Sequence, residues 1–180
     1  MPAPKRPHRQ PRIDLDQLGQ SGSIAALVAD GFTVPDFNIA AQAAERGGYR
    51  TTVASPVLSL VSGRSDTGEE MNFVVDSAPA DFTAEAFAGL LLPGGAESVK
   101  RLAGDDGARA VITAFFEAGK PVYAAGEAVG LLADIAGKSD VEGDAAVALN
   151  GDMFAGGGET ARADAAGAFA ASLQPVKTAA

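Results

Sequence analysis

The chain has 180 residues, of which 47% are hydrophobic and 21% are charged, so it is long and apolar enough to fold around one sizeable core. Cysteine is absent, which excludes disulfides, thiolate metal sites and a cysteine nucleophile. The net charge is −9, and because the first twelve residues carry four basic side chains and no acid, the remainder is more acidic still and will repel nucleic acids.

Both ends of the chain differ from its middle. Residues 1–20 are polar, contain four of the ten prolines and the only histidine, His8, and show no sustained period. We predict a disordered basic tail over 1–20, one folded domain over 21–175 and a C-terminal tail over 176–180. A polar, acidic stretch over 13–22 stands where a signal peptide would be apolar, and no apolar run approaches the ~20 residues that span a bilayer. We therefore expect a cytoplasmic protein that binds neither membranes nor nucleic acids.

Apolar runs and helical periods alternate along the folded part. The predicted strands are short runs that are apolar or rich in Thr and Val, at 24–29, 49–54, 57–61, 72–75, 87–92, 121–125 and 145–149. The predicted helices carry apolar residues at helical spacing, at 35–46, 106–118, 127–135 and 159–173. This alternation predicts an α/β fold: a doubly wound, mostly parallel sheet with helices on both faces.

Glycines and acidic residues follow three of the predicted strands. These strand ends are Asp30-Gly31-Phe32, Pro93-Gly94-Gly95 and Ala125-Gly126-Glu127. In a parallel α/β sheet, ligands bind beyond the carboxyl ends of the strands, so we expect any site there.

The order of these motifs resembles a known family. A strand ending in Pro-Gly-Gly leads through a helix to Gly119-Lys120-Pro121-Val122 and then to the elbow at Gly126-Glu127. This series resembles the DJ-1/PfpI family of class I glutamine amidotransferase-like proteins over about 24–173. Asp36 stands after Gly31-Phe32, where the family has an acidic residue, and 147–154 resembles its final strand pair. The resemblance implies a flavodoxin-like fold, a homodimer or higher homo-oligomer, and a stress-related role.

The elbow departs from the family pattern. Gly126 stands at the position of the family's nucleophilic cysteine, and Glu127 stands at the position of its histidine. Glycine adopts a positive φ without steric strain, so it suits the same sharp turn. The backbone can therefore survive while the covalent chemistry is lost.

Few other groups can replace that chemistry. Because His8 lies in the tail, the folded part has no Ser-His or Cys-His pair and no histidine ligand for zinc, and we expect neither a metal nor a cofactor. Glu127 and Asp36 are the candidate catalytic residues, as a general acid and base, although an acid in the first turn of a helix is also an ordinary stabilising feature. The amides of Gly94, Gly95 and Glu127 would form an oxyanion corner, suited to a small carbonyl or neutral ligand; the double glycine alone equally fits a tight turn.

Three functions are compatible with these residues. The first is a non-catalytic family member, a pseudoenzyme that acts by binding a small molecule or by homo-oligomeric assembly. The second is an enzyme with altered chemistry, in which Glu127 and Asp36 transfer protons on a carbonyl substrate, as in glyoxalase, deglycase or hydrolase reactions. The third is an accessory domain, because the Gly126-Glu127 elbow and 96–99 also resemble the C-terminal domain of large-subunit catalases.

Overall fold

The computed structural model describes residues 22–176. The predicted basic tail, His8 and all of the predicted C-terminal tail except Val176 lie outside the described residues. Among the helices of the described part, none combines the length and the hydrophobicity that crossing a lipid bilayer requires.

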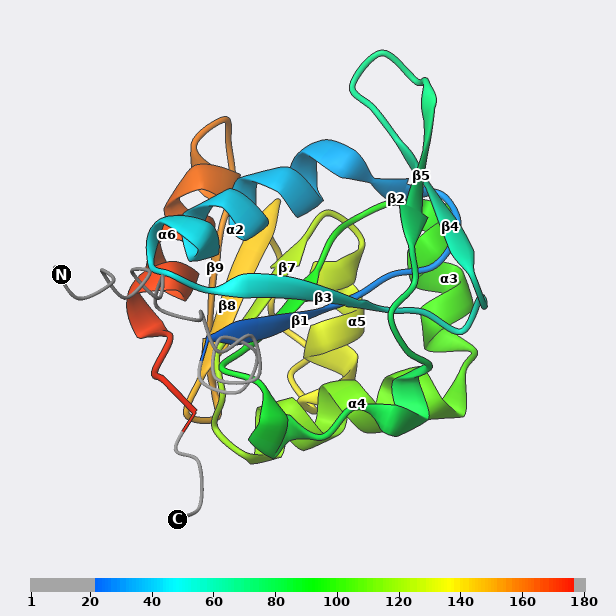
Figure 1. Cartoon of the computed structure of the whole chain (residues 1–180). Coiled ribbons are helices and arrows are strands. Elements are labelled where there is room, and N and C mark those ends of the chain that lie inside the picture. The colour runs from blue at the N-terminus through cyan, green and yellow to red at the C-terminus, as the bar shows by residue number, and fades with distance from the viewer. Residues whose placement is uncertain (1–21, 177–180) are drawn as a thin grey trace, which may run out of the picture.

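Strands and helices are interspersed along the chain (Figure 1). The strands are β1 Ser23–Leu27, β2 Phe32–Thr33, β3 Arg50–Ala54, β4 Leu60–Arg64, β5 Glu70–Val74, β6 Leu90–Leu92, β7 Val122–Ala125, β8 Ala145–Leu149 and β9 Asp152–Gly156. The helices are α2 Val34–Arg46, α3 Ala96–Ala103, α4 Asp106–Glu117, α5 Ala128–Ile135 and α6 Ala161–Ser172, with short 3-10 turns at Pro79–Asp81 and Ala84–Ala86.

Within residues 22–176 the main sheet has six strands in the order β3-β1-β6-β7-β8-β9. The first four strands are parallel, and β8 and β9 form an antiparallel hairpin at one side. Helices cover both faces of this sheet, with α2 and α6 on one face and α4 and α5 on the other (Figure 1). The prediction of an α/β, flavodoxin-like fold with a mostly parallel sheet is therefore confirmed.

Alternate residues of the central strands supply the two cores. In β7, Tyr123 and Ala125 pack with α2 and α6, whereas Val122 and Ala124 pack with α3, α4 and α5. Every residue of β7 is buried, because both faces of a parallel sheet are covered. This double burial explains why the central strands are continuous apolar runs in the sequence.

Besides adding β2 and β9 to the predicted strands, the structure differs from the predicted elements in two places. The strand pair predicted at 57–61 and 72–75 is instead β4 and β5, and it joins β2 in a separate three-stranded sheet. This hairpin rises beyond the helical layers (Figure 1). Helix α3 has no counterpart among the predictions, because its eight residues bury only Ser98, Val99 and Leu102 and so give too short a pattern.

Candidate functional site

The three glycine-containing strand ends meet at one edge of the main sheet. Their strands, β1, β6 and β7, are adjacent and parallel, so their carboxyl ends point the same way. The loops are joined directly, because the amide of Thr33 donates to the carbonyl of Gly94 at 2.8 Å. Gly95 has φ +112, and a Cβ on it would overlap the carbonyl oxygen of Gly31. Glycine at 95 is therefore required by the close approach of these two turns.

Gly126 forms the bend between β7 and α5. Its φ is +55, a left-handed conformation that side chains other than glycine rarely adopt. A Cβ there would lie 3.5 Å from Gly94 Cα, 3.7 Å from Arg162 Nη2 and 4.0 Å from Asp36 Oδ2, all ordinary contact distances. The structure thus has the strand-to-helix elbow that the sequence indicates, with a hydrogen atom in place of an attacking group.

Asp36, in the first turn of α2, lies beside this elbow. Its Oδ2 accepts a hydrogen bond from the amide of Gly94 at 3.1 Å, and its Oδ1 accepts one from Arg162 Nε at 2.6 Å. The aspartate is only 2% exposed, and a buried carboxylate requires such partners. Burial lowers the pKa of Arg162, but the hydrogen bond and charge of Asp36, together with Tyr123 and Asp144, raise it overall. Asp36 is therefore an ion-paired carboxylate that ties α2, α6 and the Gly94 turn together.

Glu127 approaches the same corner from the start of α5. Its side chain is exposed, and its Oε2 accepts a hydrogen bond from the amide of Gly95 at 2.9 Å. Asp36 Oδ2 and Glu127 Oε2 lie within 3.3 Å of the point where a Cβ on Gly94 would stand. The structure thus brings the five candidate residues together, which are Asp36, Gly94, Gly95, Gly126 and Glu127. The amides of Gly94 and Gly95 already donate hydrogen bonds to carboxylates of the same chain.

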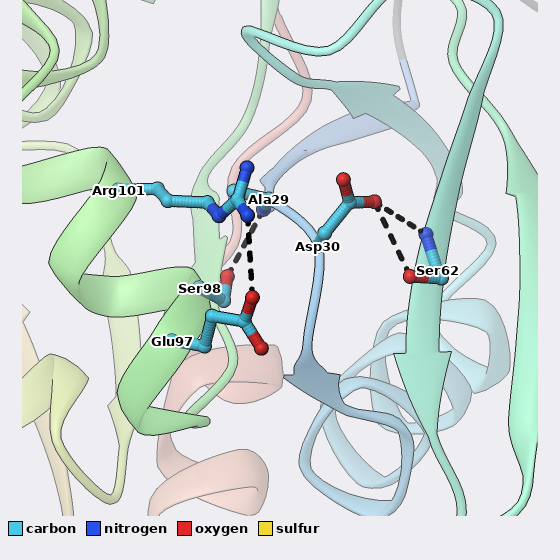
Figure 2. Close-up of polar contacts among 6 residues, drawn as sticks. All are labelled: Ala29, Asp30, Ser62, Glu97, Ser98 and Arg101. Atoms are coloured by element: carbon cyan, nitrogen blue, oxygen red, sulfur yellow. Dashed lines mark hydrogen bonds and ion pairs between the residues drawn. The ribbon is translucent and has the colours of Figure 1, made fainter.

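Hydrogen bonds also hold the rim of this edge in place (Figure 2). Ser98 Oγ, fully buried in α3, accepts from the amide of Ala29 at 3.0 Å. Asp30 Oδ1 accepts from the amide and the hydroxyl of Ser62, which fixes β4 to the end of β1. Figure 2 shows these contacts on both sides of the chain that leaves β1. These hydrogen bonds fix α3 and β4 to the loop that follows β1.

Two further residues, Arg162 and Tyr123, lie near the corner. Sequence reasoning missed Arg162, although a cation in the first turn of α6 is unfavourable to the helix dipole and so indicates a specific partner. Tyr123 in β7 is fully buried, and its hydroxyl has no hydrogen-bond partner among the described residues. Burial, and then the charge of Asp36, raise the pKa of Tyr123 far above its ordinary value of 10.0. No cluster of His, Cys, Asp or Glu suited to a metal occurs in residues 22–176.

Comparisons with known proteins agree with the fold. The model of the DJ-1/PfpI family matches residues 22–152. A ThiJ/PfpI domain protein from Brachyspira murdochii is 18% identical, with a TM-score of 0.68 over 86% of this chain and 97% of that chain. DJ-1beta from Drosophila melanogaster is 18% identical, with a TM-score of 0.64 over 86% and 91%. A protein named VC2308 is 26% identical, with a TM-score of 0.57 over 68% of this chain but only 62% of its own. No curated protein matches the sequence.

Proposed function

The chain belongs to the DJ-1/PfpI family, and we propose that it is a member without covalent catalysis, which acts by binding a small molecule or by assembling into a homodimer or larger homo-oligomer. The observation that carries the proposal is Gly126. It keeps the elbow conformation at φ +55, yet it has no side chain that can attack a substrate. A cytoplasmic location and a stress-related role belong to the same proposal.

The neighbouring side chains support it. Both carboxylate oxygens of Asp36 are already hydrogen-bonded, one to Arg162 and one to the amide of Gly94, so they are engaged within the chain. Tyr123 is fully buried, and its raised pKa keeps the phenol neutral. The residues nearest to a side chain at Gly126 are Gly94, Arg162 and Asp36, and none of them supplies the thiol or hydroxyl of a cysteine, serine or threonine nucleophile.

The corner can still admit a small carbonyl or neutral ligand. Such a ligand would accept a hydrogen bond from the amide of Gly95 after displacing the exposed carboxylate of Glu127. An anion is less suitable, because the nearby Asp36 and Glu127 carboxylates would repel it.

A second function is favoured by one contact. Asp36 and Glu127 both approach Gly94, so a proton-transfer enzyme could use the exposed Glu127 as its acid or base. The ion pair between Asp36 and Arg162 argues against this alternative, because it removes one of the two carboxylates from the chemistry.

Turnover assays on the purified chain separate the two functions. We expect no glyoxalase, deglycase or peptidase turnover above the uncatalysed rate. If turnover is found, Glu127→Gln should abolish it without lowering the melting temperature. Glu97→Gln is the matched control, since Glu97 is also an exposed glutamate at the start of a helix at this edge, and it should have no effect. Turnover that Glu127→Gln removes and Glu97→Gln preserves would overturn the proposal.

A further inference from the structure

A cavity of about 590 Å³ opens at the edge of the main sheet opposite the elbow. Ala88 lines it just before β6, Pro121 just before β7, Asn150 in the β8–β9 turn, and Ser172 at the end of α6. The elbow lies at the carboxyl ends of β6 and β7, whereas this cavity lies at their amino ends. The volume falls within the roughly 300–1,000 Å³ of typical small-molecule sites.

Two opposite charges line this cavity. Lys120 Nζ donates a hydrogen bond to the carbonyl of Phe87 at 2.7 Å, which fixes the end of the side chain. Burial lowers the pKa of Lys120, and the carboxylate of Glu85 partly offsets the shift. Within residues 22–176 no ion pair joins Lys120 or Glu85 to an opposite charge. The two charges therefore act on each other, but neither is neutralised by an ion pair within the described residues.

The walls of the cavity combine a rigid turn with apolar side chains. Asn150 has φ +52 and Gly151 has φ +87, the conformation of a tight two-residue hairpin turn. Asn150 Oδ1 lies only 3.2 Å from where a Cβ on Gly119 would stand, so the turn packs against the residue that precedes Lys120. Leu149 and Val176 add apolar surface to the same cavity.

We propose that this cavity binds a small zwitterion, an α-amino acid with an apolar side chain. Its carboxylate pairs with Lys120, its ammonium group pairs with Glu85, and its side chain contacts Leu149 and Val176. A simple anion would face the carboxylate of Glu85, and a simple cation would face Lys120. A neutral ligand would cover both charges without giving either one an ion-pair partner, which costs affinity. This site does not depend on the function proposed for the elbow.

The test is an NMR titration of the ¹⁵N-labelled chain with leucine. We expect saturable shifts at the amides of Gly119, Lys120, Asn150 and Gly151. N-acetyl-leucine lacks the ammonium group and leucinamide lacks the carboxylate, so each should bind at least about tenfold more weakly than leucine. These two analogues leave the protein unchanged, so their result does not depend on the folding of a variant.

Two variants complete the experiment. Lys120→Met and Glu85→Gln should each weaken leucine binding by about tenfold or more. Glu97→Gln, at the opposite edge of the sheet, should leave it unchanged. The absence of saturable shifts would refute the proposal, as would analogues that bind as tightly as leucine. Unchanged binding in a folded Lys120→Met and in Glu85→Gln would also refute it.

Discussion

The two edges of the main sheet use their polar groups in opposite ways. At the carboxyl edge, the amides of Gly94 and Gly95 bind the carboxylates of Asp36 and Glu127, and Asp36 also binds Arg162. At the amino edge, the charges that line the cavity lack ion-pair partners within residues 22–176. At the elbow the chain's own polar groups thus bind one another, whereas at the cavity we propose that a ligand pairs with the two charges. Substitutions at the carboxyl edge should therefore act mostly on stability.

The largest effect is expected from Gly95→Ala. The methyl group would overlap the carbonyl of Gly31, and φ +112 is itself unfavourable for alanine. Together these should lower the free energy of unfolding by about 3–5 kcal/mol, or prevent folding. Gly130→Ala is the control, because Gly130 lies within α5 with nothing within 4 Å of the new methyl, and it should stabilise the chain by about 0.5–1 kcal/mol. Urea unfolding measures both variants. A Gly95→Ala chain as stable as the parent would contradict the close packing of the turns at Gly31 and Gly95.

Removing the buried carboxylate should have the next largest effect. Asp36→Ala leaves the amide of Gly94 and the guanidinium of Arg162 without their partner, and we expect a loss of about 2–3 kcal/mol because Arg162 is partly exposed. Asp36→Asn keeps an acceptor for the amide and should cost less.

The control for this prediction is an exposed ion pair. Asp134 binds Arg109 at 3.0 Å with most of its side chain in solvent, so Asp134→Ala should change the free energy of unfolding by less than about 1 kcal/mol. Equal losses from Asp36→Ala and Asp134→Ala in urea unfolding would show that the Asp36 pair is not what holds the corner.

A third substitution separates backbone strain from crowding. At Gly126 a methyl group would meet its neighbours at 3.5 Å or more, so only the positive φ opposes Gly126→Ala. We expect a loss of about 1–2 kcal/mol, clearly smaller than for Gly95→Ala. Urea unfolding of the two variants side by side is the measurement. If Gly126→Ala proves the more damaging, the elbow is more tightly packed than the contact distances indicate.

The sequence predicts those features that depend on neighbouring residues. The buried strands β1, β6 and β7 are apolar runs, and the turns at 31, 95 and 126 need glycine because each has a positive φ. The strand predicted at 57–61 begins earlier than β4 because Leu58 is apolar, yet Leu58 lies outside the strand and is 74% exposed. The ion pair of Arg162 with Asp36 joins residues 126 positions apart, and no local pattern specifies such a contact. No local pattern specifies the cavity at the amino edge either, since four separate segments of the chain build it.

The smallest effect at neutral pH is expected from Tyr123→Phe, within about 1 kcal/mol, because the hydroxyl that is removed has no partner among the described residues. The difference should appear in alkali. Burial raises the pKa of Tyr123 above 10.0, so near that pH the unfolded chain releases the phenolic proton while the folded chain keeps it. Ionisation of Tyr123 therefore leaves the free energy of unfolding of the parent unchanged below about pH 10 and lowers it as the pH rises further. Tyr123→Phe removes the part of this loss that comes from Tyr123. Burial also raises the pKa of Tyr49, so the variant still loses some stability in alkali. Urea unfolding between about pH 8 and about pH 11 gives the slope of the free energy of unfolding against pH for the parent and for Tyr123→Phe. Equal slopes would mean that the phenol of Tyr123 reaches solvent in the folded chain, and would contradict its complete burial.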